Sequence, residues 1–241
     1  MPRKGTPTNA VPPETVARRL AFDVLKAVRV DGAFANLELA SQLKQARLSG
    51  RDAAFATELV AGTLRGRGSY DAILGACVAR SLQRVDPDAL DVLRLGAHQL
   101  LALHLPHHAA INTSVDLARS VVGEKVTGFV NAVLRQVAVK QLDVWLRRIA
   151  PRREADPLGH LAIVHSHPKW VVEQLHRALG DLEGTDELEA LLVANNQPPK
   201  VTLVARPGRS TREELPGEPT AYSPYGVTLS GGNPSDIAAV A

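Results

Sequence analysis

The chain has 241 residues, enough for one large or two small domains, and its 45% hydrophobic content can supply a core. It holds no run of 18 apolar residues and no apolar secretory signal, so we predict a cytoplasmic location and no membrane partner. Residues 1–150 hold 20 Lys/Arg against 13 Asp/Glu, whereas residues 151–241 hold 8 against 12. A basic front half is typical of a protein that binds a polyanion.

The first 13 residues hold Pro, Thr, Asn, Gly and two basic residues, and we predict a disordered basic tail because nothing in them can be buried. A helix is expected next, from Glu14 to Val28, since apolar residues recur at every fourth position. A second helix is expected after Asn36. Ser49 and Asp52 have the spacing of a capping box, which predicts the start of a third helix.

Three glycines follow the third helix, at Gly62, Gly66 and Gly68. Because Arg65 and Arg67 lie among them, we predict a flexible basic loop that can approach a nucleic-acid backbone closely. Ser69 is expected to cap a fourth helix. Asp86 followed by Pro87 has the pattern of a helix N-cap with proline at the first helical position, which predicts the start of a fifth helix.

Helical periodicity continues to Val139, so the front part of the chain is predicted to be a compact all-helical bundle. From Lys200 the apolar residues alternate instead, which predicts one strand near residues 201–206 and another at 226–230. Two strands cannot close a sheet by themselves, and the Gly/Pro-rich tail shows no stop signal. We therefore expect the chain to be the front piece of a longer protein.

The stretch from Leu93 to Arg135 resembles the RNA-binding helical domain named after the antitermination factor NusB, and four segments resemble, in order, the front end of a methyltransferase family that carries such a domain. They are ARRLAFDVL (17–25), GRDAAFATELVAGTLR (50–65), the helix that leads into HHAAIN (107–112), and GFVNAVLR (128–135). Beyond them, SHPKWVVEQ (166–174), LLVANNQPP (191–199) and TLVARPG (202–208) are similar to the front part of bacterial ribosomal RNA cytosine-C5 methyltransferases of the RsmB (Sun/Fmu) family. The resemblance covers nearly everything after residue 14.

This resemblance implies a mainly α fold. A NusB-like RNA-binding bundle would occupy residues 14–149, a helical connector 150–199, and an incomplete RRM-like α+β subdomain 200–241, with the catalytic domain absent. The implied function is to position small-subunit ribosomal RNA for methylation by a C-terminal domain of the same parent chain. S-adenosylmethionine would be the cofactor of that parent, and this chain would need none.

Methylation at cytosine C5 needs a thiolate that adds to C6, together with an acid, a base and bound cofactor. Cys77 is the only cysteine, and its small apolar neighbours predict a buried, inert thiol. Gly231 and Gly232 have no following helix, so we interpret them as a turn and not as a cofactor loop. The histidines around Pro106 lack other ligands at metal-binding spacing and are expected to be loop or cap residues: His104, His107 and His108.

Arginine suits phosphate because its planar guanidinium donates two hydrogen bonds at once. The residues predicted to contact RNA follow the tail, the first helix and the glycine-rich segment: Arg3, Lys4, Arg18, Arg19, Lys26, Arg29, Arg65 and Arg67. Arg94 and Arg135 are expected to be structural, with Asp91 or Asp116 as partners. Trp145 and Trp170 are expected to pack between domains.

Two alternatives remain from the sequence. The first is an antitermination factor that binds leader RNA together with a ribosomal protein, although a free-standing NusB should end near residue 145. The second is a protein-interaction module without an RNA role.

Overall fold

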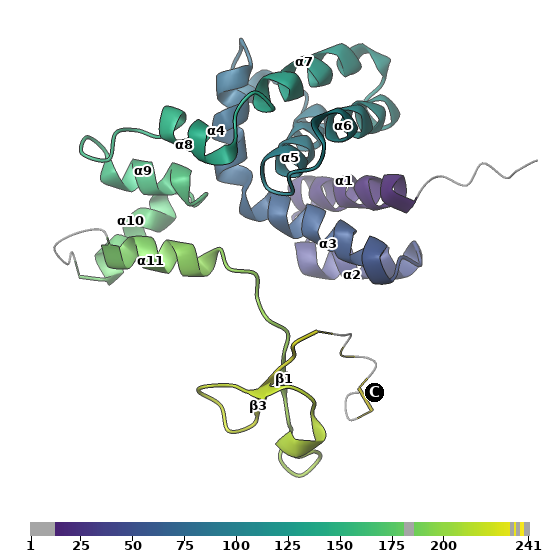
Figure 1. Ribbon diagram of the computed structural model, residues 1–241, viewed down its shortest axis with the longest axis vertical. Helices are drawn as coiled ribbons and strands as arrows, with labels where there is room; N and C mark the ends of the chain where they lie inside the picture. The colour runs from purple at the N-terminus through teal and green to yellow at the C-terminus, as the bar shows by residue number, and fades with distance from the viewer. Residues whose placement is uncertain (1–12, 181–185, 232–233, 235–236, 239–241) are drawn as a thin grey trace, which may run out of the picture. The chain divides into compact units, whose positions relative to one another are not determined.

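The computed structural model describes residues 13–180, 186–231, 234 and 237–238. The predicted basic tail, with Arg3 and Lys4, therefore lies outside the described residues. The chain forms two compact units, Met1–Val193 and Ala194–Ala241. Figure 1 labels the helices of the first unit and two strands of the second.

The first unit is helical. Its helices are α1 (Pro13–Asp31), α2 (Ala35–Gln45), α3 (Gly50–Arg65), α4 (Arg67–Cys77), α5 (Pro87–Leu101), α6 (His107–Val121), α7 (Thr127–Val137), α8 (Leu142–Ile149), α9 (Pro157–Val164), α10 (Lys169–Ala178) and α11 (Asp186–Asn195). None of the described helices combines the length and the apolar character that crossing a bilayer requires. The predicted mainly α fold is confirmed.

Local capping chemistry explains some helix starts and not others. The Asp86 carboxylate accepts hydrogen bonds of 3.0 Å from the backbone N–H groups of Asp88 and Ala89, with Pro87 in the first turn, so this predicted cap is confirmed. Ser49 lies at the N-cap of α3 but makes no capping hydrogen bond there. Ser69 lies inside α4, and its hydroxyl donates to the backbone oxygen of Ile163 (2.6 Å). The predicted start of α3 at Ser49 is therefore confirmed, although the capping hydrogen bond is not formed, and the cap predicted at Ser69 is wrong.

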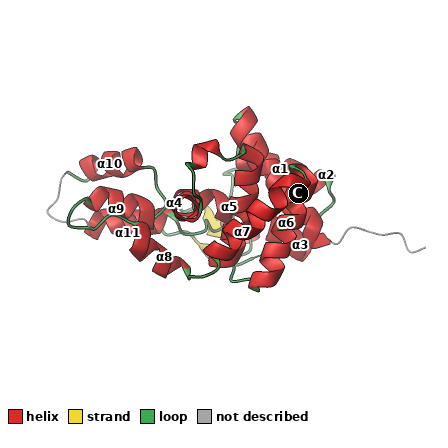
Figure 2. Ribbon diagram, turned by 90° about the horizontal axis from the view of Figure 1, so that it is seen from above, coloured by secondary structure: helices red, strands yellow, loops and turns green. Residues whose placement is uncertain are grey.

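Helix α5 forms the centre of the main core. All its residues from Asp91 to Leu101 are buried, because α1, α3, α4, α6 and α7 pack around it (Figures 1 and 2). A helix that is covered on every side is normally apolar all round. Here the buried set also includes four polar side chains, Asp91, Arg94, His98 and Gln99. Each of these needs a partner inside the bundle.

The glycines between α3 and α4 do not form a loop. Gly62 lies within α3, and Gly66 is the single residue that separates α3 from α4. A side chain at Gly62 would collide with the His98 ring, and one at Gly66 would collide with the Tyr70 ring. The prediction of a flexible basic loop is therefore wrong, since these glycines allow large side chains to pack closely.

Helices α9, α10 and α11, predicted as a connector, have a small apolar core of their own. It consists of Leu161, Ala162, Val172, Leu188 and Leu192. Figures 1 and 2 show these helices on the opposite side of α4 from α1 and α6. The Ser166 hydroxyl accepts a hydrogen bond from the backbone N–H of Gly68 (2.9 Å), which joins this group to the start of α4.

The second unit contains a three-stranded antiparallel sheet in the order β1-β3-β2. The strands are β1 (Thr202–Val204), β2 (Glu218–Pro219) and β3 (Gly226–Thr228). Leu203 pairs with Val227, and a small core forms from Ala205, Leu215 and Val227. The two predicted strands are confirmed, and β2 was not predicted.

Candidate nucleic-acid interface

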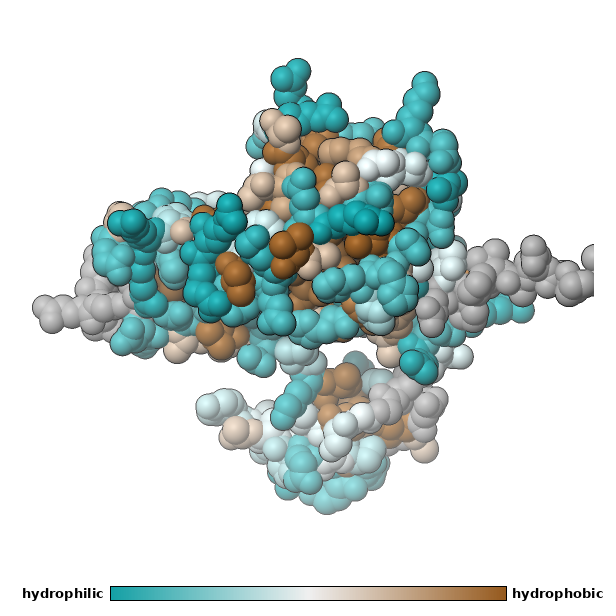
Figure 3. All heavy atoms as spheres, turned by 45° about the horizontal axis from the view of Figure 1, so that its top comes forward, coloured by the Kyte–Doolittle hydropathy of each residue, from teal (hydrophilic) through white to brown (hydrophobic). Residues whose placement is uncertain are grey.

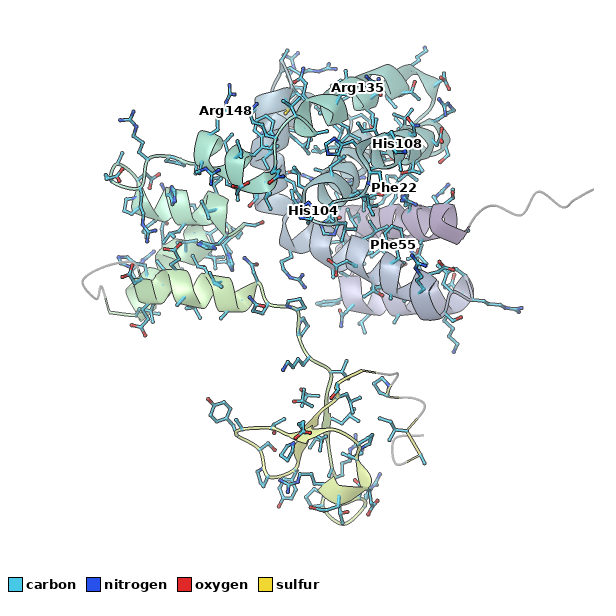
Figure 4. The ribbon with its side chains drawn as sticks, viewed as in Figure 1. Phe22, Phe55, His104, His108, Arg135 and Arg148 are labelled. Atoms are coloured by element: carbon cyan, nitrogen blue, oxygen red, sulfur yellow. The ribbon has the colours of Figure 1, made fainter. Side chains whose placement is uncertain are left out.

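Arg18 does not present its side chain to solvent. Only 5% of the residue is exposed, and its Nε donates a hydrogen bond to the Gln99 side-chain oxygen (2.7 Å) inside the bundle. Its guanidinium carbon lies 5.0 Å from the ring centroid of Phe55 on α3, which Figure 4 labels. The expectation that Arg18 offers a guanidinium to RNA is therefore wrong, because burial and these internal contacts occupy the group.

Arg19, the next residue, is exposed, and its Nε pairs with the Asp23 carboxylate one turn further along α1 (2.9 Å). Arg18 and Arg19 both line a hollow of about 400 Å³ between the start of α1 and α6, together with Thr113 and Asp116. An exposed pair at this helical spacing contributes little stability, so Arg19 can exchange its partner for a phosphate.

Lys26 and Arg29, further along α1, are held by carboxylates of α5. The Lys26 ammonium lies 2.7 Å from Asp88, and Arg29 pairs with both Asp88 and the buried Asp91 (2.7 Å). Partial burial acts to raise the pKa of Asp88, but hydrogen bonds from Lys26 and Arg29 outweigh it and hold this pKa below the usual value. These two predicted RNA contacts are therefore engaged within the protein.

The same ion-pair network continues into α4. Arg94 donates to Asp91 (2.8 Å) and to Asp71 (2.7 Å), which confirms the predicted Arg94–Asp91 pair. Arg67 lies 3.8 Å from Asp71 at the other end of the network. Burial acts to lower the pKa of Arg94, and hydrogen bonds from Asp71 and Asp91 more than compensate, so the guanidinium stays charged.

The predicted contacts do not form one patch. Arg18 meets Phe55 near the start of α3, whereas Leu25 and Val28 line a small hollow with Leu64 near its end, so α1 and α3 run in the same direction. Arg29 and Arg67 line that hollow together. Arg65 ends α3 and is half-buried, and Arg67 begins α4 and is exposed. Arg19 lies at the opposite end of α1.

Tyr70 and His98 form a buried polar pair that the sequence did not indicate. The Tyr70 hydroxyl lies 2.9 Å from His98 Nδ1, and Glu58 Oε1 lies 3.6 Å from Nε2. Burial lowers the pKa of His98 to about 4 and raises that of Tyr70. Both rings are therefore neutral at physiological pH. They are buried, so we assign them a structural role.

Cys77 is buried at the end of α4, as predicted. Burial raises the pKa of its thiol, while the charges of Lys140 and Arg148 act in the opposite direction. These basic neighbours could not be inferred from the sequence, because they lie more than 60 residues further along the chain.

Trp145 and Trp170 have different surroundings. Trp145 is buried, and its indole N–H donates to the backbone oxygen of Val137 (2.9 Å), whereas Trp170 is 67% exposed. Trp145 therefore packs within the main core and not between domains, and the packing predicted for Trp170 is wrong.

Among the described residues, no group of three or more His, Cys, Asp or Glu is placed to hold a metal ion. His104 and His107 line a hollow of about 510 Å³ with Lys140.

Basic residues that the sequence reasoning did not assign to RNA, including Arg135, which was expected to be structural, gather where α4 ends, between α7 and α8. We call this set the α4–α8 basic face: Arg80, Arg135, Lys140 and Arg148. Figure 4 labels Arg135 on α7 and Arg148 on α8, on either side of the end of α4. Figure 3, which turns this end toward the viewer, shows hydrophilic side chains over much of the surface with apolar patches between them.

Comparison with known proteins agrees with the helical bundle and its motifs. The model described as the NusB family matches residues 15–139. The chain belongs to the NusB family. A solved structure, that of PH0851, has a TM-score of 0.67 and 15% identity, and the match covers 96% of this chain and 52% of that chain. At this identity the likeness concerns the fold alone.

The sequence relatives of this NusB-family chain are longer proteins. A Mycobacterium tuberculosis protein, named provisionally as a methyltransferase, is 46% identical over 228 residues, which is 93% of this chain and 50% of the relative. A Bacillus subtilis protein, named provisionally as ribosomal RNA small subunit methyltransferase B, is 31% identical over 84% of this chain and 43% of its own length. The Klebsiella pneumoniae ribosomal RNA small subunit methyltransferase B is 26% identical over 70% of this chain and 36% of its own length. The chain thus spans half or less of each relative, and the predicted resemblance to the RsmB family is confirmed.

Proposed function

We propose that this chain is the RNA-binding N-terminal region of an S-adenosylmethionine-dependent enzyme that methylates cytosine C5 in small-subunit ribosomal RNA in the cytoplasm. The observation that carries the proposal is the combination of two matches. The NusB family model covers residues 15–139, and nearly the whole chain aligns with half of a longer relative named as a methyltransferase. The bundle holds the RNA while the remainder of the parent protein transfers the methyl group.

The described residues do not fit the methyl-transfer step. S-adenosylmethionine, when bound, supplies the methyl group, and a doubly wound domain holds such a ligand beyond the carboxyl ends of parallel strands. The sheet β1-β3-β2 is antiparallel. Cys77 has a raised pKa and is buried, so it does not supply the thiolate that the reaction requires.

RNA is held by basic side chains that reach solvent. On the α1 side, Arg19, Arg65 and Arg67 are the proposed phosphate contacts, and the terminal Arg3 and Lys4 extend this set. Lys26 and Arg29 contribute positive potential while remaining paired with Asp88. Arg18 supports the fold from inside and is no longer proposed as a contact.

The test is a filter-binding titration of the 241-residue chain with fragments of small-subunit ribosomal RNA, with DNA of the same sequence as the matched control. We expect RNA to bind more tightly than DNA, and its association constant to fall as salt is added. We also expect the isolated chain to transfer no methyl group from S-adenosylmethionine. Equal binding of RNA and DNA, or methyl transfer by the chain alone, would contradict the proposal.

A NusB-type antitermination factor is the second candidate, favoured by the family match itself. About 100 residues follow the matched region, and relatives named as methyltransferases align across them. Preferential binding to a leader transcript over small-subunit ribosomal RNA would favour this second candidate.

A further inference from the structure

The positive charge of the front half is concentrated away from α1. Residues 72–85 and 127–150 hold six Lys/Arg and one Asp/Glu, an excess of five positive charges out of the seven found in residues 1–150. These segments include the end of α4, α7 and α8. The predicted α1 surface therefore lies outside the region that carries most of the net charge.

Packing brings these separate segments together. Helix α4 packs against both α7 and α8, and its end lies between them in Figure 1. The Arg80 guanidinium, just beyond α4, lies 5.6 Å from the ring centroid of Phe129 on α7. Lys140 Nζ lies 4.9 Å from the Trp145 ring on α8. Lys140 and Arg148 are both close enough to Cys77 for their charges to act on its pKa.

The two surfaces differ in how much of their charge is neutralised. On the α1 side, Arg19, Lys26 and Arg29 each pair with an aspartate. In residues 72–85 and 127–150 the single acidic residue, Asp143, pairs with Arg147 (2.8 Å) and not with a member of the face. Arg135 donates to the neutral amide of Asn131 (3.2 Å).

Arg80, Arg135 and Arg148 are exposed, so their guanidinium groups are accessible to a ligand. Arginine forks recognise phosphate by paired hydrogen bonds, and uncompensated cations release counterions from nucleic acid when they bind. A protein partner would instead need an apolar or aromatic anchor at the centre of the surface. The exposed large apolar side chains in these segments are two valines, Val139 and Val144.

We propose that the α4–α8 basic face, formed by Arg80, Arg135, Lys140 and Arg148, is a second RNA-binding surface that contacts the phosphate backbone and supplies most of the electrostatic affinity. This inference rests on the proposed function, because it names where on the NusB-family bundle the RNA is held. The α1 contacts then orient the RNA, with a smaller share of the binding free energy.

The experiment compares two triple variants of the 241-residue chain with equal charge loss. The face variant carries Arg80→Gln, Arg135→Gln and Arg148→Gln. The control carries Arg47→Gln, Arg51→Gln and Arg177→Gln, which remove three exposed arginines from α2–α3 and α10. Binding to a small-subunit ribosomal RNA fragment is measured from about 50 to 200 mM salt, the range over which phosphate contacts change affinity strongly.

For the face variant, we expect the negative slope of log K against log salt to become shallower by about two to three. We also expect the affinity at low salt to fall at least ~10-fold. For the control, the slope should change by less than about one. Replacing the same three face residues by lysine should restore most of the slope, since lysine keeps the charge. Thermal unfolding of each variant verifies that it is folded.

The outcomes separate the two proposals. If the unmodified chain binds RNA but the face variant keeps its slope, or loses no more than the control, the face is overturned and the proposed function stands. If the unmodified chain does not bind RNA at all, both are overturned. If the face binds an acidic protein segment instead of RNA, the unmodified chain binds RNA and the face variant keeps its slope.

Discussion

At the residue scale, the buried pair of Tyr70 and His98 determines which residues fit at positions 62 and 66. His98 approaches α3 at Gly62, and Tyr70 approaches the chain at Gly66. The His98 Nδ1 faces the Tyr70 hydroxyl at 2.9 Å. In the tautomer that places the proton on Nε2, Tyr70 donates to Nδ1 and the ring N–H faces Glu58. The His98 and Tyr70 rings thus occupy the space beside Gly62 and Gly66 that larger residues would otherwise fill.

Substituting Gly62→Ala should destabilise the first unit, because the new methyl group overlaps the His98 ring and the core is closely packed. We expect a loss of about 1–3 kcal/mol in the free energy of unfolding, measured by urea denaturation. The matched control is Gly75→Ala at an exposed position of α4, where the added carbon meets Leu82 Cδ1 at 3.4 Å, an ordinary contact. That change should be neutral or stabilising by up to ~1 kcal/mol. Equal effects at both positions would contradict this explanation.

His98 should make stability depend on pH. Its pKa is lowered to about 4 in the folded state by burial, whereas an unfolded histidine titrates near 6.5. The unfolded state therefore binds the proton more tightly, and stability is full above pH 6.5 and is lost as the pH falls from 6.5 to 4. The expected contribution is about 3 kcal/mol between pH 8 and pH 4.

The measurement is the urea unfolding free energy at several pH values for the unmodified chain and for His98→Gln. The variant should lose less stability than the unmodified chain between pH 6.5 and pH 4. Parallel pH curves for the two proteins would show that His98 is not the group responsible.

Sequence could predict residues whose role depends on their neighbours along the chain, such as the cap at Asp86 and the buried thiol of Cys77. It could not predict the fate of Arg18, because the acceptor of its hydrogen bond, Gln99, lies 81 residues away. The glycine at position 62 was misinterpreted for the same reason. Its conformational freedom is visible in the sequence, whereas the ring it accommodates comes from another helix.

At the element scale, α1, α5 and α4 are joined by ion pairs that centre on Asp91. This residue is 2% exposed and accepts from both Arg29 and Arg94. Buried cations that lose their partner are costly, because the desolvated charge is no longer compensated. The network therefore fixes how the three helices pack.

Asp91→Asn should cost about 1–3 kcal/mol of unfolding free energy, since Arg29 keeps Asp88 and Arg94 keeps Asp71 but both lose a charged acceptor. The control is Asp23→Asn, which removes the exposed partner of Arg19 and should cost less than about 1 kcal/mol. Chemical denaturation of both variants makes the comparison. Similar losses in the two variants would mean that burial of the network does not determine how much it contributes to the free energy of unfolding.

Periodicity identified the helices because each has an apolar face that packs on the main core or on the α9–α11 core. It could not identify β2, which has two residues and includes Pro219, a residue that strand patterns disfavour. The α4–α8 basic face was also beyond the sequence, since Arg80 lies 55 residues before the next member, Arg135. Charge counting found the basic half of the chain but not its location on the fold.

At the scale of the whole molecule, the two compact units have separate apolar cores. We expect a chain shortened to residues 1–196, which keeps α11 whole, to fold and to retain the RNA affinity of the 241-residue chain within about threefold. The reason is that the proposed contacts all precede residue 150, and distant sites contribute independently. Circular dichroism and filter binding measure the two properties. A folded but non-binding fragment would place essential contacts in the second unit.

The proposed binding of ribosomal RNA to the α4–α8 basic face of this NusB-family bundle can be mapped along the chain. The measurement is ultraviolet crosslinking of the 241-residue chain to a 4-thiouridine-labelled small-subunit ribosomal RNA fragment, with peptide mapping by mass spectrometry. We expect crosslinks within residues 72–85 and 127–150, with fewer in α1. Crosslinks confined to residues 194–241, or none above the level of a non-binding control protein, would contradict the proposed binding.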